Sequence, residues 1–341
     1  MILLVTDKKD VHPNPVLNHL AKAEYPIFRL NTDALLTDYE FAWTIRHGQL
    51  DFFIRNVRTQ LIVWGHEINA LWERRPSSPK EIPAEPANEI VEKFILDEAR
   101  GFVFDLRHFL GGRYAVGHPL FDCHSDSKMW QLKVAHELGM DIPATVIANR
   151  KKDFVEFADC HSDLLIKPLN SDSAHDFDSN IEQVFYSRKV TRQQIASADE
   201  SSMSQTVCCI QEYIPKKYEL RITVVHDRIF TCKIDSQSQN EEEGRIDWRQ
   251  GYDFGIRHEI AEIPDPIKNF CLAYLRRMHL NFGCFDFIVT PDDRYVFLEC
   301  NPNGQWLWIE KETGLPISEA IAEVLMLADR GLLAYNNNSC Y

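Results

Sequence analysis

The sequence predicts an α/β (α+β) protein built of three units, at residues 1–115, 116–205 and 206–341. Its 341 residues are too many for one compact core, so more than one unit is expected. Short apolar runs with strand character alternate with longer segments whose apolar residues recur at helical spacing. The hydrophobic share of 45% and the charged share of 26% are ordinary for a folded, soluble chain and place it in the globular class.

The first unit begins with the apolar run Ile2–Thr6, which is too short for a membrane span and is predicted to be a buried strand. The other elements expected before residue 69 are a helix at Val16–Lys22 and strands at Pro26–Asn31, Phe41–Arg46 and Asp51–Ile54. Two proline-containing stretches, Asn69–Pro76 and Pro79–Pro86, predict a passage rich in loops.

A long helix is predicted from Pro86 to Leu110, where Gly111-Gly112 ends it. Its apolar residues form one stripe at helical spacing and are expected to face the core. The stripe consists of Val91, Ile95, Ala99, Phe102, Leu106 and Phe109.

In the second unit, Ser125 or Asp126 is predicted to cap a helix that runs to Leu138 and stops at Gly139. Strands at Pro143–Ala148 and Leu164–Lys167 are expected around a short helix, then a strand at 182–188 and a weak helix at 191–198. The third unit should hold strands at 207–213, 218–226, 228–235, 283–290 and 294–300 and helices at Pro266–Leu280 and Pro316–Ala328. Ile267, Phe270, Cys271, Tyr274 and Met278 should face inward.

Three oxygen-bearing side chains near the end of the chain predict a magnesium site. Asp286 lies in the strand Gly283–Thr290 on the face of Cys284 and Ile288, and Glu299 and Asn301 share a face with Phe297 in the next strand. If the two strands form a hairpin, Asp286 and Glu299 converge. Two inward carboxylates on apolar strands are costly without a cation, and hard oxygen ligands suit magnesium held with phosphates. The alternative is that Arg276, Arg294 or solvent satisfies these acids.

With the string from Glu299 to Trp306, this pattern resembles the ATP-grasp superfamily, in which an acid on one strand and an E-x-N on the next bind two magnesium ions. The resemblance implies an N-terminal pre-grasp domain, a central domain and a C-terminal ATP-grasp domain that use ATP and Mg²⁺. It also implies that Lys128 and Lys167 reach the ATP phosphates, a task that suits compact ammonium groups.

Three further positions follow from the same resemblance. The backbone of Gln211-Glu212-Tyr213-Ile214 stands where relatives receive adenine, and Glu219 stands where they place a ribose-binding acid. Arg221 matches an arginine that stabilises the acyl phosphate, and its planar fork fits a pair of phosphoryl oxygens. The chain departs from the family in having no glycine between Met140 and Glu243, so residues 169–180 replace the usual glycine-rich phosphate loop. It carries no P-loop or dinucleotide fingerprint.

Three strings narrow the resemblance to the microviridin-type graspetide synthetases: Trp72–Pro76 (WERRP), IDSQ with DWR between 234 and 249, and NPNGQWLW from Asn301. That family implies phosphorylation of Asp or Glu side chains in a ribosomal precursor peptide, followed by attack of a Thr or Ser hydroxyl or a Lys amine. Arg249 and Lys233 are the next candidates for contact with the core peptide or acyl phosphate; a solvated pair on a loop is the alternative. By analogy, residues 180–205 should dock the leader peptide, and a homodimer is expected.

Two other functions stay open from the sequence. One is a ligase that adds a free amino acid to a peptide or protein, in the manner of glutamate-adding or glutathione-forming enzymes. The other is an ATP-binding regulator without turnover, against which the joint presence of both metal acids and Arg221 argues. The net charge of −14 argues against nucleic acid as a partner. Nine cysteines without a CxxC pair predict a reduced, cytoplasmic protein, and no run is long enough for a membrane partner.

Overall fold

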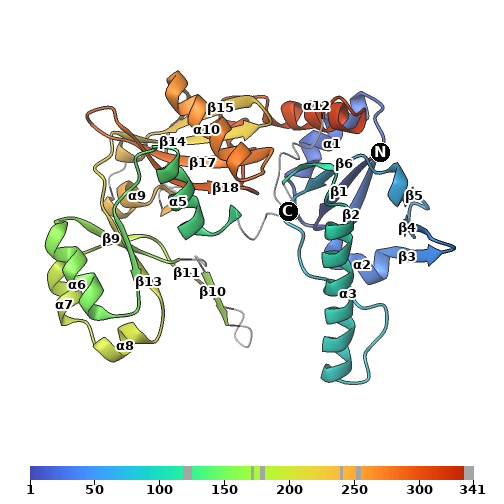
Figure 1. Ribbon diagram of the computed structural model, residues 1–341, viewed down its shortest axis with the longest axis horizontal. Coiled ribbons are helices and arrows are strands. Elements are labelled where there is room, and N and C mark those ends of the chain that lie inside the picture. The colour runs from blue at the N-terminus through green and yellow to red at the C-terminus, as the bar shows by residue number, and fades with distance from the viewer. Residues whose placement is uncertain (118–124, 170–172, 177–180, 239–240, 251–254, 334–341) are drawn as a thin grey trace.

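The computed structural model describes residues 1–117, 125–169, 173–176, 181–238, 241–250 and 255–333. Figure 1 shows the N-terminal sheet on one side, the central sheet on the other, and the C-terminal sheet above the space between them. The mixed α/β architecture predicted from the sequence is confirmed. No helix in these described ranges is long and apolar enough to cross a membrane.

The N-terminal unit is built on a parallel sheet of order β2-β1-β6-β7. Its strands are β1 (Ile2–Thr6), β2 (Ile27–Asn31), β6 (Ala70–Glu73) and β7 (Tyr114–Val116), and its helices are α1 (Pro13–Lys22), the short α2 (Leu35–Asp38) and α3 (Glu89–Phe109), with 3-10 turns at Thr32–Ala34 and Gly65–Glu67. The predicted loop at Asn69–Pro76 is therefore wrong, because its first half is a fully buried inner strand.

A second sheet of the same unit is antiparallel and consists of β3 (Tyr39–Arg46), β4 (Gln49–Asn56) and β5 (Ile62–Trp64). Helix α3 covers its base, where Phe41 stacks on Phe102 with ring centroids 4.0 Å apart. Asn88 caps the helix by accepting a hydrogen bond from the Val91 backbone. The predicted inward stripe of α3 holds only in part: Ala99 and Leu106 are buried, whereas Val91 is exposed, since the first half of the helix extends past the sheet.

The central sheet is antiparallel, in the order β12-β9-β13-β8. The elements of this region are helices α5 (Lys128–Glu137), α6 (Lys151–Cys160), α7 (Arg192–Ser197) and α8 (Glu200–Ser204), strands β8 (Thr145–Ala148), β9 (Leu164–Lys167), β12 (Arg188–Val190) and β13 (Cys208–Glu212), and the hairpin β10 (Ser173–Asp176) with β11 (Ile181–Val184). The strand expected at 182–188 is thus two strands. The predicted caps Ser125 and Asp126 are also wrong, because the Ser127 side chain accepts the capping bond from the Trp130 backbone.

The C-terminal sheet has the order β16-β15-β14-β17-β18 and is antiparallel. Its strands are β14 (Tyr218–Val225), β15 (Arg228–Ile234), β16 (His258–Ile260), β17 (Phe282–Val289) and β18 (Tyr295–Asn301); its helices are α9 (Glu242–Ile246), α10 (Asp265–Arg277), α11 (Leu307–Thr313) and α12 (Ile317–Asp329), with a 3-10 turn at Ser236–Ser238. Helix α10 covers one face, and its five predicted inward residues are all buried. The opposite face carries the polar residues of a cavity.

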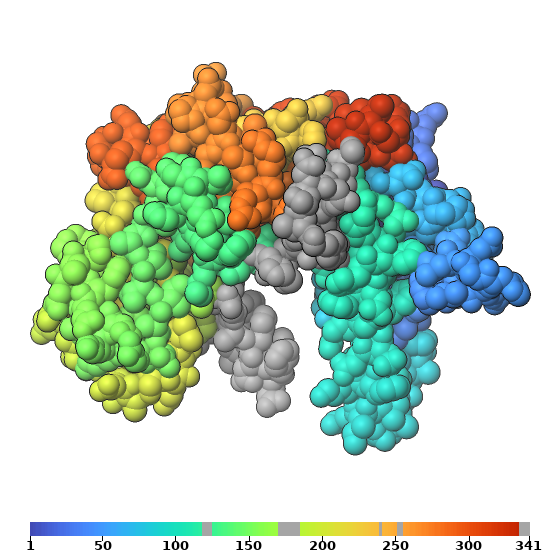
Figure 2. Space-filling model, viewed as in Figure 1, coloured from blue at the N-terminus to red at the C-terminus, as the bar shows by residue number. Residues whose placement is uncertain are grey.

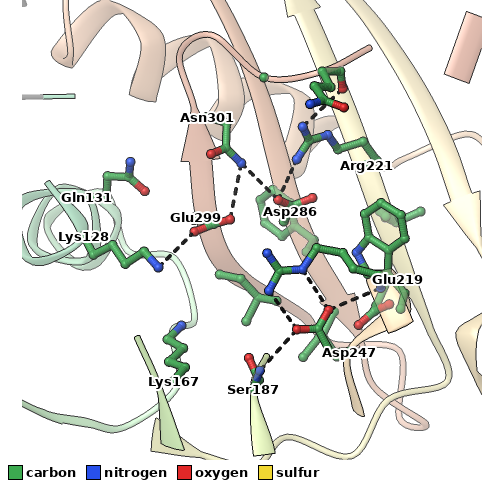
Figure 3. Close-up of a pocket in the computed structure, with 18 of the residues that line it drawn as sticks. Lys128, Gln131, Lys167, Ser187, Glu219, Arg221, Asp247, Asp286, Glu299 and Asn301 are labelled. Carbon is green, nitrogen blue, oxygen red and sulfur yellow. Dashed lines mark hydrogen bonds and ion pairs between the residues drawn. The ribbon is translucent and has the colours of Figure 1, made fainter. Parts of the chain in front are cut away.

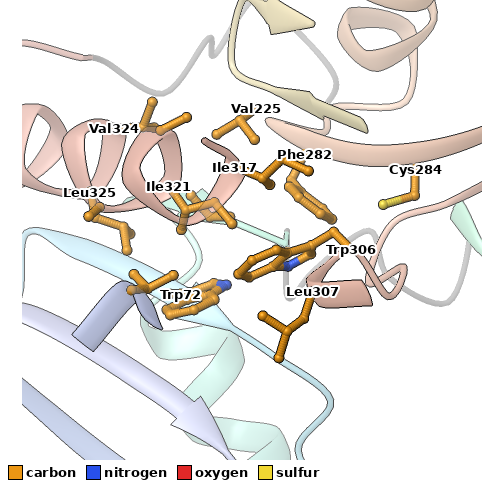
Figure 4. Close-up of a cluster of buried hydrophobic side chains, with 14 of the residues drawn as sticks. Trp72, Val225, Phe282, Cys284, Trp306, Leu307, Ile317, Ile321, Val324 and Leu325 are labelled. Atoms are coloured by element: carbon orange, nitrogen blue, oxygen red, sulfur yellow. The ribbon is translucent and has the colours of Figure 1, made fainter. Parts of the chain in front are cut away.

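One apolar cluster joins the N-terminal sheet to the C-terminal helices (Figure 4). Trp72 of β6 and Trp306, which precedes α11, are both almost fully buried in it, together with Ile321 and Leu325 of α12. Burial of such large side chains is the main source of stability between the two units. Residues at opposite ends of the sequence are thereby fixed on either side of the cavity.

We expect Ile321→Ala to lower the free energy of unfolding by about 2–5 kcal/mol, because the side chain is fully buried and its removal leaves a cavity. Urea denaturation followed by tryptophan fluorescence measures this change. Ile45→Ala, at an exposed position of β3, is the matched control and should shift stability by no more than about 0.5 kcal/mol. Equal effects of the two substitutions would contradict the role assigned to this cluster.

Candidate active site

A cavity of about 1000 Å³ lies where the three units meet. All predicted site residues except Lys233 line it: Lys128, Lys167, Gln211, Glu212, Tyr213, Ile214, Glu219, Arg221, Arg249, Asp286, Glu299 and Asn301. The N-terminal unit adds Glu73, Arg75, Pro76 and Arg107 to the wall. Figure 2 shows the molecule hollowed between the central unit and helix α3.

The two candidate metal acids face each other across neighbouring strands. Asp286 of β17 is the register partner of Glu299 of β18, as the hairpin predicts. The register shifts between Asp286 and Phe287, so that Leu298 is an extra residue in β18. This bulge corrects one expectation: Phe297 does not share the face of Glu299 but is buried beneath α10, because the extra residue reverses the alternation of faces.

Cations from two directions hold the carboxylates (Figure 3). The Arg221 Nη1 atom donates to Asp286 Oδ2 over 2.6 Å, and the Lys128 Nζ atom lies 3.8 Å from Glu299 Oε2. The Asn301 amide nitrogen lies 3.3 Å from an oxygen of each acid and donates to both. Neither acid contacts the alternative partners Arg276 or Arg294 among the bonds described.

The electrostatics of this pair fit a cation site. Burial raises the pKa of Asp286 to about 6, with repulsion from Glu299 adding to the shift and Arg221 opposing it. Burial also acts to raise the pKa of Glu299, but the charges of Lys128 and Lys167 lower it overall. Asp286 is therefore an incompletely compensated carboxyl group, which is the environment that a divalent cation stabilises.

The donor set matches magnesium. The candidate site offers two carboxylates and one amide. Among the described residues there is no group of three His, Cys, Asp or Glu side chains that could hold a metal. Magnesium commonly takes one or two protein carboxylates and completes its shell with phosphate oxygens and water. Asp286, Glu299 and Asn301 would therefore hold magnesium jointly with a nucleotide, where it would neutralise phosphate charge.

The two lysines predicted to bind phosphate come from separate elements. Lys128 begins α5 and donates to the Pro168 carbonyl over 3.3 Å, while Lys167 ends β9. Burial and the nearby charge of Lys128 lower the pKa of Lys167, and Glu299 opposes the shift. Both ammonium groups lie on the Glu299 side of the cavity (Figure 3), where an anionic ligand would relieve their mutual repulsion. Most of segment 169–180 lies outside the described residues.

The hinge segment, Gln211–Ile214, is the stretch predicted to receive adenine; it begins at the end of β13 and is fixed by the central sheet. The Glu212 and Tyr213 backbone nitrogens donate to the Ala144 and Asp163 carbonyls over 2.9 and 2.8 Å. Because these two amides are already bonded, a purine edge at this segment would meet its carbonyl groups and Ile214 instead. Glu219, on β14, pairs with the buried Lys216 but leaves its Oε2 atom without a partner among the described residues. Burial raises the pKa of Glu219 despite this pairing.

Arg249 is brought to the cavity, but Lys233 is not. Arg249 donates to both oxygens of Asp247 over 2.9 and 2.8 Å, and Asp247 also accepts from the Ser187 backbone. Lys233 is the register partner of Leu220, which faces α10, and it pairs with Glu259 of β16. The structure does not bring Lys233 together with the other predicted site residues, because strand register places its side chain on the face opposite the cavity.

Two positioning residues escaped the sequence analysis. Gln131 of α5 donates to the Cys300 carbonyl over 2.8 Å and accepts from the Cys300 backbone over 3.0 Å, which ties Lys128's helix to the strand of Glu299. Arg74 donates to the Asn303 carbonyl over 2.8 Å. The only sequence signal for Gln131 is its place three residues after Lys128, on the same face of the helix.

The fold and cavity define an ATP-dependent ligase, and the comparisons agree. The chain belongs to the RimK-like ATP-grasp family, whose model matches residues 125–325, more than half of its length. It is accordingly an ATP-grasp ligase that uses ATP and Mg²⁺. No curated protein sequence matches the chain.

Solved structures are similar over nearly the whole chain. A RiPP-associated ATP-grasp ligase of Chryseobacterium gregarium, in complex with ADP and a leader and core peptide, is 26% identical with a TM-score of 0.87 over 99% of each chain. The macrocyclase MdnC of Microcystis aeruginosa, bound with precursor peptide MdnA, is 28% identical with a TM-score of 0.79 over 96% of this chain and 99% of its own. MdnB of the same organism, at 24% identity and a TM-score of 0.73 over 95% and 98%, shares the fold. The family resemblance stated from the motifs is confirmed.

Glu299→Gln should abolish ATP turnover and weaken magnesium-dependent ADP binding while the fold persists, because a neutral amide cannot replace the charge of a metal ligand. Phosphate release, calorimetry with and without magnesium, and thermal melting measure the three quantities. Glu259→Gln, outside the cavity, serves as control. Near wild-type turnover in Glu299→Gln, with unchanged thermal stability, would refute the metal assignment.

Lys128→Ala and Lys167→Ala should each weaken nucleotide binding roughly 10- to 150-fold, since each removes a charge-assisted contact worth about 1.5–3 kcal/mol. Calorimetric titration with ADP and magnesium measures the affinity. Lys133→Ala lies on the same helix as Lys128 but pairs with Glu137 at the surface, so it should bind ADP normally. Unchanged affinity in both cavity variants would exclude this phosphate site.

Proposed function

We propose that this ATP-grasp ligase modifies a ribosomal precursor peptide by phosphorylating Asp or Glu side chains and coupling them to Thr or Ser hydroxyls or Lys amines. The observation that carries the proposal is the similarity over 99% of both chains to a ligase solved with ADP and a leader and core peptide. The second similar enzyme is described as a macrocyclase bound with its precursor. The products would be macrocyclic ω-esters or ω-amides.

The cavity supplies groups for both halves of such a reaction. In the first, a substrate carboxylate oxygen attacks the γ-phosphorus of ATP, and ADP leaves. In the second, a hydroxyl or amine attacks the acyl carbon, phosphate leaves with the acyl C–O bond broken, and the nucleophile gives up its proton. Arg221 bonds to Asp286 and to the Gln305 carbonyl, which supports a role for its guanidinium in stabilising charge on the transferring phosphoryl group.

Arg249 is the second proposed contact for the peptide or acyl phosphate. Its guanidinium is held by Asp247 and lies 5.8 Å from the ring centroid of Tyr186. Burial works to raise the pKa of Asp247, but its bonds to Arg249 lower it, so the pair is charged. The Ser187 bond connects this pair to the start of the segment 180–205, which we propose docks the leader. The domain boundaries, a homodimer and a cytoplasmic location stay predictions.

A ligase that adds a free amino acid is the second candidate, because the RimK-like family model by itself does not specify the acceptor. The two reactions differ in product mass. Intramolecular coupling removes one water per ring, whereas amino-acid addition makes the product heavier by a residue. The geometry around Asp286 and Arg221 serves either reaction, so only the acceptor distinguishes them.

Incubating the protein with ATP, magnesium and the short peptide encoded beside its gene should remove water stepwise from the peptide and release one phosphate per ring. Mass spectrometry and phosphate release measure both, and hydroxylamine sensitivity identifies esters. Arg221→Ala should reduce turnover far more than ATP affinity, because its contact strengthens as charge develops. Addition of a free amino acid to an acceptor, with the precursor unmodified, would reject the proposal but leave the ATP-grasp assignment intact.

A further inference from the structure

The charged residues of the motif Trp72–Pro76 are Glu73, Arg74 and Arg75, and they lie in three different environments. Trp72 is buried in the cluster of Figure 4. Glu73 is also buried and accepts two hydrogen bonds from Arg107 of α3, over 2.8 and 2.5 Å. Alternation along β6 sends Trp72 and Arg74 toward the C-terminal unit and Glu73 toward α3.

Arg74 is a structural anchor. Only 2% of its surface is exposed, its Nη1 atom donates to the Asn303 carbonyl over 2.8 Å, and its Nε atom lies 3.5 Å from Asp10 Oδ2. It therefore fixes the end of β6 against the loop that follows Asn301. Because Arg74 is fixed, the backbone of the next residue, Arg75, is held in place at its N-terminal side.

Arg75 is held in a costly backbone conformation beside the cavity. Its φ of +44° lies in the left-handed region, which a non-glycine residue seldom adopts, and the following Pro76 restricts it further. The chain beyond is also anchored, since Ser77 donates to Asp7 over 2.5 Å and its carbonyl accepts from Thr32 over 2.6 Å. Strain maintained by such fixed surroundings is typical of functional positions.

The other cations of the cavity wall illustrate why Arg75 is unusual. Five of them contact a carboxylate: Arg107 with Glu73, Lys128 with Glu299, Lys216 with Glu219, Arg221 with Asp286, and Arg249 with Asp247. Lys167 faces the charge of Glu299 and is assigned to phosphate. Arg75 lines the same cavity, is exposed, and has no hydrogen bond or ion pair with any residue in the described part of the chain.

We propose that Arg75 binds a side-chain carboxylate of the acidic peptide substrate and so determines which peptides the enzyme accepts; this rests on the proposed function for its substrate class. A planar guanidinium binds a carboxylate through two parallel hydrogen bonds. The wall that carries Arg75 belongs to the N-terminal unit, whereas the hinge and both phosphate lysines belong to the central region. The chain carries a net charge of −14, so a local cation on this wall favours the approach of a peptide that bears Asp or Glu side chains.

The test measures binding of the peptide encoded beside the gene, fluorescently labelled, in the presence of ADP and magnesium, where no turnover occurs. Arg75→Ala should weaken peptide binding roughly 10- to 100-fold without changing ADP affinity. Arg75→Lys should fall between the two, because it keeps the charge but loses the fork. Arg46→Ala is the matched control, an exposed arginine of the same unit whose side chain has no hydrogen bond or ion pair among the described residues.

A series of peptides, each with one core Asp or Glu changed to its amide, identifies the carboxylate. One such change should weaken binding to the wild type as much as Arg75→Ala does and have no further effect on the variant. Purely additive effects at every position, unchanged peptide binding, or loss of ADP affinity would each overturn the inference.

A second probe separates this inference from the proposed function. Glutarate, a small dicarboxylate, should shift the ¹⁵N resonance of the Arg75 side chain, a signal identified by its absence in Arg75→Ala. If the wild type does not bind the encoded peptide but glutarate shifts this resonance, the substrate assignment fails and the carboxylate site stands. Absence of a shift at saturating glutarate overturns the site whatever the peptide does.

Discussion

Two like charges turned toward the same cavity are the constraint on which the rest of the structure depends. Asp286 and Glu299 are register partners on adjacent strands, and neither could be kept ionised there without opposite charge nearby. Arg221 comes from the neighbouring strand β14, and Lys128 comes from α5. Gln131 fixes α5 to the backbone of β18, so the cation and the carboxylate that it faces cannot drift apart.

The loop between Asn301 and Trp306 transmits this arrangement to the N-terminal unit. Arg221 donates to the Gln305 carbonyl over 3.3 Å from one side, and Arg74 donates to the Asn303 carbonyl from the other. Between them, a Cβ atom on Gly304 would lie 2.8 Å from Arg221 Nη2 and 2.5 Å from Cys284, so only glycine fits. The wall that carries Arg75 and the wall that carries Asp286 and Glu299 are therefore connected through the backbone of residues 303–305.

Much of this could be predicted from residue order, and the failures have definite physical causes. The convergence of Asp286 and Glu299 could be predicted because each acid interrupts one of two successive apolar strands that pair as a hairpin. The bulge at Leu298 could not be predicted, since an extra residue changes which face Phe297 occupies without changing composition. Strand β6 was missed because Glu73 is neutralised by Arg107, a residue 34 positions away. Lys233 was misplaced because register, set by hydrogen bonds to β14, decides its face.

The ion pairs of the cavity also explain why nucleotide and metal should bind together. Lys128 lies near Glu299 and Arg221 bonds to Asp286, so each acid has a cationic neighbour, although burial leaves Asp286 incompletely compensated. Phosphate alone would draw the lysines toward itself and leave Glu299 less compensated, at a cost set by its burial. A divalent cation alone would stabilise Asp286 but would repel the nearby charges of Arg221 and Lys128. When phosphate and the divalent cation bind together, their charges nearly cancel, and each lysine and arginine of the site keeps an anionic partner. The same ion pairs thus favour joint binding of ATP and magnesium over either one separately.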